Sequence, residues 1–293
     1  MVGYLVFITI STSLFALFAL GLNLQWGFTG LINFGHVAFM TVGAYATVLL
    51  SNRGVPLPIA IMLGAAIASL LGLLIGLFTL RLREDYLAIV TIGISELLRL
   101  IALNEEWLTQ GPFGIQRYPL PLDRFEPNLL GKIITIGLIT VLAIFATWQL
   151  WTGLRSQWKD IKKIKGKSYQ PTKLISLIIW GVIGLGLILT VYINGCIALL
   201  DYNYKAGLML LILITLALVY WGLQRLVKSP WGRILKAIRE DEEIPRALGK
   251  NVFWYKLQAF MLGGAIAGIA GAFYAWQLTT VYPSNFEPLV TFN

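Results

Sequence analysis

Long apolar runs separated by short polar segments form the main pattern of this sequence. No charged residue occurs before Arg53. A helix made of the residues before it would be roughly 78 Å long at 1.5 Å per residue, against a membrane hydrocarbon core of about 30 Å. The stretch therefore has to cross a membrane at least twice. Windows of about 20 apolar residues predict eight spans, at residues 2–22, 31–50, 57–80, 86–103, 131–151, 174–193, 207–224 and 257–279.

Composition points to the same class of protein. Hydrophobic residues make up 57% of the chain and charged residues 13%, about half the charged share of a soluble globular domain. The first residues lack the positively charged region of a secretory signal peptide. We therefore predict an all-α polytopic bundle of about eight transmembrane helices, organised as one transmembrane domain over residues 1–293.

Basic residues are concentrated in three segments that alternate onto one side of the membrane, at residues 81–85, 152–173 and 225–256. These segments hold seventeen lysines and arginines, and the segments of the opposite side hold five. Because cytoplasmic loops carry the excess of positive charge, we place the three segments in the cytoplasm and both chain ends outside. The net charge of +9 thus follows from topology and does not indicate nucleic-acid binding. Residues 159–173 are also suited to contact anionic membrane lipid.

Residues 21–36 combine glycines with polar side chains between two apolar runs. Glycines allow a broken or tightly turned backbone, and broken helices are where transporters often place substrate sites. The polar side chains Asn23, Asn33 and His36 are therefore candidates for the lining of a substrate pathway. A glycine-rich turn with satisfied polar side chains explains the same pattern, and both interpretations stand.

Two charged residues fall inside the fourth predicted span. Glu96 and Arg99 are three residues apart, so they lie on one helical face and can pair with each other. Charges within a membrane usually face the interior of a bundle. Pathway lining and a structural ion pair are equally compatible with this placement.

Small residues recur at helical spacing in two spans, at Gly64, Ala68, Gly72 and Gly76, and again at Gly264, Gly268 and Ala272. Rows of this kind let transmembrane helices approach closely. We interpret both rows as packing surfaces.

Residues 231–249 form the strongest local signal in the chain. The first part is amphipathic, with Ile234 and Ile238 on one face and Arg233, Lys236 and Arg239 exposed. The acidic residues 240–243 suit the beginning of a second short helix, which Pro245 and Gly249 would start and end. A helix, a turn and a helix outside the membrane predict a docking element for a cytosolic partner, and a solvated amphipathic loop is the alternative.

Three segments resemble LivM-type permeases, the inner-membrane subunits of ABC importers for branched-chain and other hydrophobic amino acids. They are residues 21–50, with Gly30-Leu-Ile-Asn-Phe-Gly-His36; residues 108–115; and residues 232–275, with Ala237-Ile-Arg-Glu240, Ala247-Leu-Gly249 and Ala267-Gly-Ile-Ala-Gly-Ala-Phe-Tyr-Ala275. Within this family, the residue pattern of the three segments most resembles that of cyanobacterial neutral amino acid permeases. This chain departs from the family at Ile244-Pro245, in the basic insertion 152–173, and in stopping at Asn293, which suggests truncation at the C-terminus.

The resemblance implies a transport subunit rather than an enzyme. It implies a homologous second permease, two cytosolic ATPases that carry ATP and Mg, and a periplasmic substrate-binding protein. It also places the chain in a bacterial inner membrane with its N-terminus in the periplasm, and it assigns no cofactor or metal to this chain. The ATPases would dock on a coupling loop within residues 225–256, whose candidate residues are Arg239, Glu240, Asp241, Glu242, Pro245, Arg246, Ala247 and Gly249.

Two alternatives stay open at this point. One is a urea-importing permease of the same family, because no residue pattern here distinguishes urea from leucine, alanine or proline. The other is a secondary transporter or channel that works without ATPases, which the scarcity of ionisable residues within the spans disfavours. The sequence contains no Gly-x4-Gly-Lys-Ser/Thr phosphate loop, so we do not expect this chain to bind ATP.

Overall fold

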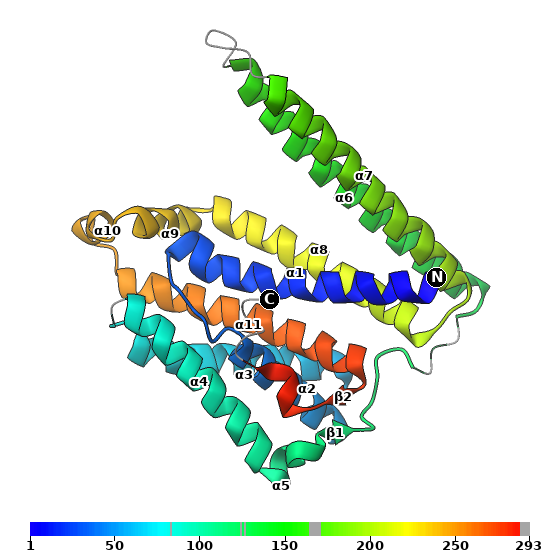
Figure 1. The fold of residues 1–293 in the computed structure, drawn as a ribbon, viewed down its shortest axis with the longest axis horizontal. Helices are drawn as coiled ribbons and strands as arrows, with labels where there is room; N and C mark the ends of the chain where they lie inside the picture. Colours follow the sequence, from blue (N-terminus) through cyan, green and yellow to red (C-terminus); the bar gives the residue numbers. More distant parts are fainter. Residues whose placement is uncertain (83, 124, 126, 164–170, 288–293) are drawn as a thin grey trace. The chain divides into compact units, whose positions relative to one another are not determined.

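The computed structural model describes residues 1–82, 84–123, 125, 127–163 and 171–287, and it is helical almost throughout (Figure 1). Its packing divides the chain into two compact units. Unit 1 comprises Met1–Ile10 and Arg124–Ile214, and unit 2 comprises Ser11–Asp123 and Thr215–Asn293. The all-α fold is as predicted. The prediction of one domain over the whole chain stays a prediction.

Unit 2 holds most of the helices. They are most of α1 (Val2–Thr29), then α2 (Val37–Asn52), α3 (Leu57–Thr79), α4 (Glu84–Asn104), α5 (Glu106–Thr109), the end of α8 (Tyr204–Lys228), α9 (Pro230–Glu240), α10 (Glu243–Ala247) and α11 (Val252–Leu278). Two short 3-10 helices, η1 (Gly111–Phe113) and η2 (Pro283–Phe286), complete it. Strand β1 (Ile115–Gln116) pairs antiparallel with β2 (Thr280–Val281), with Ile115 opposite Val281.

The core of unit 2 is the packing of α2, α3 and α11, which lie side by side in Figure 1. A Cβ atom placed on Gly43 of α2 would lie 2.3 Å from the Cα of Gly268 on α11, so these two backbones are in direct contact. The four small residues Gly64, Ala68, Gly72 and Gly76 are all buried on α3. The prediction that both small-residue rows are packing surfaces is confirmed.

Unit 1 is built on a different plan. Helices α6 (Leu129–Lys163) and α7 (Pro171–Leu200) pack as a pair, followed by the first half of α8. Thr140 on α6 and Tyr192 on α7 bring their hydroxyl oxygens to 3.3 Å. The side chains of this pair are mostly large and exposed, as expected of helices that face lipid.

Among the described residues, seven helices are long and apolar enough to cross a membrane, and α2 is a shorter apolar helix. They correspond to the eight predicted spans, but several boundaries differ, two of them beside the connection between α1 and α2. The predicted span 31–50 begins as a helix only at Val37, because residues 30–36 are not helical. The predicted end of the first span at residue 22 is wrong, because α1 continues to Thr29.

The predicted cytoplasmic loop 152–173 is helical where it is described. Helix α6 continues through residues 152–163, and α7 begins at Pro171. With 35 residues, α6 is about 52 Å long, which exceeds a hydrocarbon core of about 30 Å. Residues 164–170, with Lys165 and Lys167, lie outside the described residues, as do Arg83, Arg124 and residues 288–293. Contact of residues 159–173 with lipid stays a prediction.

Candidate functional site: the α1–α2 break and the α9–α10 element

Helix α1 ends in a tight turn at residues 30–36. Gly30 has φ +77°, a left-handed conformation that glycine adopts without strain. The turn lets the Leu31 N–H donate back to the Gln25 carbonyl oxygen at 3.1 Å. Gly21 and Gly27 do not bend the helix, contrary to the expectation of a break from residue 21 onward. Gly21 instead lets α11 approach closely, because a Cβ there would lie 2.7 Å from the Gly263 carbonyl oxygen, whereas a Cβ on Gly27 would meet the Asn23 side chain of the same helix.

A buried hydrogen-bond network centred on Gln25 holds this break. The Gln25 amide nitrogen donates to the Phe260 carbonyl of α11 at 2.9 Å, and its amide oxygen accepts from Asn33 at 2.8 Å. Asn33 in turn accepts from the Gly35 N–H at 3.1 Å. Thr91 of α4 accepts from the Phe34 N–H at 3.2 Å. Non-helical backbone at membrane depth is tolerated only when it is buried and satisfied in this way.

His36 is the last residue of the break and directly precedes α2. Its ring is fully buried between Phe18 and Phe39, with ring centroids 4.7 and 5.8 Å away. Within the described structure, neither ring nitrogen has a side-chain or backbone partner with hydrogen-bond geometry. The environment is apolar, which fits a packing residue better than a proton relay.

Glu96 and Arg99 form the predicted ion pair on α4. Arg99 donates to both carboxylate oxygens, at 2.9 and 2.5 Å. The pair begins one residue after Ser95, whose side chain lies against Gly35 in the break. Both side chains stay partly accessible, 38% for Glu96 and 21% for Arg99. A charged pair left accessible within a membrane helix calls for water or another protein chain beside it, because lipid solvates charge poorly.

The structure therefore brings together only part of the predicted pathway lining. Asn33 and His36 lie in the break, and Glu96 and Arg99 lie on the adjoining helix. Asn23 is elsewhere: it is exposed and lines a groove between α1, α8 and α9.

The loop 225–256 adopts the predicted helix–turn–helix form, as α9 followed by α10. The apolar face of α9 packs through Leu235 and Ile238 into a cluster with Leu24 of α1 and with Val252 and Ala259 of α11. Its basic residues Arg233, Lys236 and Arg239 are exposed, as predicted. This packing seats α9 on the ends of the membrane helices.

Helix α10 follows α9 and projects away from this packed cluster. Pro245 is buried on it, whereas Ile244 is 58% and Leu248 72% exposed. Glu242 pairs with Lys256 of α11 and lies 3.9 Å from Arg246, which fixes the base of the turn. The Glu243 N–H is capped by Asp241 at 2.8 Å, and Gly249 ends the turn with φ +72°. Glu240 and Ala247 are exposed at its surface.

One hydrogen bond joins the loop to the α1–α2 break. Arg239, at the end of α9, donates to the Gly27 carbonyl of α1 at 2.5 Å. Its side chain also lies against Gly30, where the left-handed turn begins. Gln25, with its bonds to Phe260 and Asn33, lies within the preceding turn of the same helix. Covalent and hydrogen-bonded steps therefore connect the end of α9 with the break.

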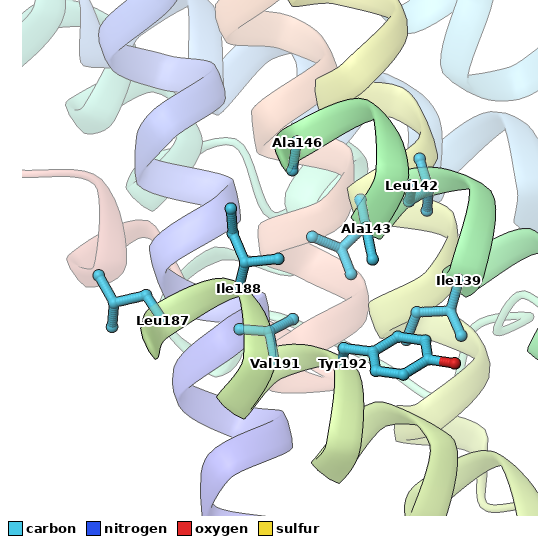
Figure 2. A pocket seen from close by; sticks show the side chains of 9 residues that line it. Ile139, Leu142, Ala143, Ala146, Leu187, Ile188, Val191 and Tyr192 are labelled. Atoms are coloured by element: carbon cyan, nitrogen blue, oxygen red, sulfur yellow. The ribbon is translucent and has the colours of Figure 1, made fainter. Parts of the chain in front are cut away.

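A cavity of about 220 Å³ lies within unit 1, between α6, α7 and α8. Figure 2 shows its lining, in which the ring of Tyr192 lies at one edge of a group of aliphatic side chains from α6 and α7. Tyr192 is the only polar side chain among the nine lining residues. A site for a zwitterionic amino acid needs polar groups for its ammonium and carboxylate, so this cavity is not suited to one.

The fold is that of a polytopic α-helical membrane protein, with the helix–turn–helix element α9–α10 between two of its long apolar helices. The family described as "Branched-chain amino acid transport system / permease component" matches residues 4–158 and 129–293. The chain belongs to this family.

Named relatives agree with the family. The chain is 29% identical to "High-affinity branched-chain amino acid transport system permease protein LivM" of Escherichia coli (strain K12), over 94% of this chain and 53% of the relative. The values for the protein of the same name from Salmonella typhimurium are the same. A "Probable branched-chain amino acid transport permease protein LivM" of Methanocaldococcus jannaschii is 22% identical over 93% of this chain and 67% of the relative. The chain thus spans about half the length of the first two, and no solved structure matches it.

Several residues of this site were missed by the sequence-based prediction. Gln25 was one polar residue among many in its segment, and nothing marked it as the centre of a network. Thr91 and Ser95 had no signal, because hydroxyl side chains are common in apolar helices. Ile244 and Leu248 could have been found as apolar residues within a charged segment.

Proposed function

We propose that this chain is the transmembrane permease subunit of an ABC importer and forms half of the translocation pathway for branched-chain or other neutral amino acids. Family membership supports the permease role. The observation that carries the importer mechanism is the α9–α10 element, which exposes two apolar side chains at its tip and bonds to the end of α1 at its base. Exposed apolar residues on a cytosolic projection suit a protein partner.

The partners in this proposal are two cytosolic ATPases, a homologous second permease and a periplasmic binding protein, in a bacterial inner membrane. ATP and Mg would be held by the ATPases, and this chain would hold no cofactor. Among the described residues, no group of three or more His, Cys, Asp or Glu side chains is arranged to hold a metal. The accessible Glu96–Arg99 pair supports a second protein chain or a water-filled pathway beside α4.

In this mechanism, ATP-driven closure of the ATPases moves α10, and α9 passes the movement to α1 through Arg239. The break at residues 30–36 then changes its packing against α4 and α11. Asn33, His36, Glu96 and Arg99 are the candidates for the lining that is rearranged.

The test separates docking from transmission. Ile244→Asp with Leu248→Asp is expected to release the ATPases, because each places a charge at the apolar contact. Arg239→Ala is expected to keep the ATPases bound and to lower amino acid uptake, because it breaks the bond to Gly27. Lys250→Ala, a neighbouring exposed residue, is the control.

Co-purification of the ATPases and uptake of labelled substrate are the two measurements. Replacement of Glu240 and Gly249 extends the test to the turn itself, where unchanged co-purification and uptake in both variants would contradict the loop assignment. A panel of leucine, alanine, proline and urea identifies the substrate. Uptake that continues without the ATPases would instead favour a secondary transporter or channel.

A further inference from the structure

The groove between α1, α8 and α9 differs in character from the cavity of unit 1. It has a volume of about 220 Å³, and all of its lining residues belong to unit 2. Apolar side chains form most of the lining, which consists of Leu20, Asn23, Leu24, Phe28, Tyr220, Leu223, Gln224, Val227, Lys228 and Lys236. Along α1 it runs from residue 20 to residue 28, about 12 Å at 1.5 Å per residue.

The charges of the groove are all of one sign. Lys228 at the end of α8 and Lys236 on α9 are both exposed, and none of the ten lining residues is acidic. The Lys236 ammonium lies 5.8 Å from the centre of the Phe28 ring, so it is held above the apolar wall. Arg225, one turn before Lys228, lies over the ring of Trp221 at 3.8 Å. The positive end of the groove thus adjoins an aromatic residue of the kind found at membrane interfaces.

The position of the groove places its two ends in different surroundings. The apolar end lies between the membrane helices α1 and α8, and the basic end lies where α8 passes into α9. The charge bias of the sequence assigns that basic end to the cytoplasm, where anionic lipids attract lysine and arginine. An apolar trough that leads to two lysines at this depth matches one ligand, which has a hydrocarbon chain and an anionic head group.

We propose that this groove binds an anionic phospholipid, with an acyl chain along Leu20, Leu24 and Leu223 and its phosphate between Lys228 and Lys236. Because Lys236 belongs to α9, a bound lipid would join α1, α8 and α9 at the base of the docking element. This site is independent of the transported substrate.

The test measures phosphatidylglycerol bound to the 293-residue chain in detergent by native mass spectrometry, with phosphatidylcholine of the same acyl chains, which has no net charge, as the comparison. Lys228→Gln with Lys236→Gln is expected to weaken phosphatidylglycerol binding roughly 30-fold, at about 1 kcal/mol for each lysine. Lys250→Gln, an exposed lysine outside the groove, is the matched control and is expected to bind as the unmodified chain does.

Two further arms distinguish a lipid groove from a general anion site. Val227→Trp fills the apolar part while leaving both lysines in place, and it is expected to reduce binding as well. Soluble glycerol phosphate, which has the head group without the chains, is expected not to displace the lipid. Equal loss with Lys250→Gln, undiminished binding with Val227→Trp, or displacement by glycerol phosphate would each overturn the proposal.

Discussion

Helices α7 and α11 are both long and apolar, yet they are used in opposite ways. In the most apolar stretch of α11, 72% of the residues are buried within the chain, whereas none are in that of α7, which is the more apolar helix. Side-chain size separates them. Gly263, Gly268 and Gly271 of α11 lie against the backbone of α1, α3 and α2, while the glycines of α7 meet only side chains of α6 and α8 or nothing within 4 Å. In lipid, large apolar side chains gain little by burial, so close backbone packing decides which helices form the core.

The largest expected effect on stability comes from adding one methyl group to a glycine that packs against the backbone of α11. Gly43→Ala on α2 would place a Cβ 2.3 Å from the Gly268 Cα on α11, where only backbone could move aside. We expect a loss of about 3 kcal/mol or more of stability, measured as a fall in the melting temperature of the purified protein.

Gly186→Ala on α7 is the matched control for that substitution. A Cβ at this position has nothing within 4 Å, so the better helix propensity of alanine should leave stability unchanged or raise it by about 0.5 kcal/mol. Equal destabilisation by the two variants would contradict the distinction between core and lipid-facing helices.

An intermediate effect is expected at the buried network. Gln25→Ala removes the bonds to Phe260 and Asn33 and leaves both partners buried without them, a loss of about 1–3 kcal/mol. Thermal unfolding measures the loss, and uptake should fall with it because the break loses its support.

Asn194→Ala on α7 provides the comparison, because the Asn194 amide donates only within its own helix, to the Thr190 carbonyl, in the bonds described. We expect it to change stability by less than about 0.5 kcal/mol. A similar loss in both variants would show that the Gln25 network contributes nothing beyond one ordinary amide.

The smallest effect is expected at two tyrosine hydroxyls. Tyr118, which follows β1 in the chain, donates to the Ala275 carbonyl of α11, and Tyr118→Phe should cost about 1 kcal/mol near neutral pH. Burial raises the pKa of the Tyr118 hydroxyl above its ordinary value, so the folded state keeps this proton more tightly than the unfolded state does. The contribution is therefore complete below about pH 10 and is lost as the pH rises further.

The measurement is the difference in melting temperature between the unmodified chain and Tyr118→Phe, followed from neutral to alkaline pH. It should shrink above about pH 10 as the unmodified chain loses this stabilisation. A difference for Tyr118→Phe that stays constant across the pH range would rule out the linkage between this proton and stability.

The second tyrosine is Tyr192 in the α6–α7 pair, and Tyr192→Phe should lower the stability of the protein by about 0.6 kcal/mol.

Apolar runs were enough to predict where the helices lie, and small-residue spacing identified the rows that pack α3 and α11. The charge pattern of residues 231–249 predicted α9 and α10 and the exposed side of α9. Glycine misled the prediction at α1, because Gly21 and Gly27 both lie inside the helix, Gly21 at a close approach to α11, and the left-handed turn is made at Gly30. The sequence around a glycine does not show whether it turns the chain or lies within a helix, because that depends on the helix packed against it.

Other features were beyond the sequence for related reasons. Residues 152–163 are polar and basic, so they suggested a loop, although they continue α6 as a helix. The central role of Gln25 depends on the Phe260 carbonyl, 235 residues away. The placement of Asn23 away from Asn33 depends on the end of α1 at Gly30, which apolarity does not reveal.

The dependence of α2 and α3 on α11 has a consequence for synthesis of the chain. After Thr79 ends α3, the ribosome has to make the residues up to Val252 before α11 begins. At a synthesis rate of about 5–20 residues per second, α2 and α3 wait in the membrane for roughly 10–35 s. During that time the surfaces at Gly43 and Gly72 lack their final partner, α11. Cells therefore have to shield this half-finished bundle from wrong partners until its last helix arrives.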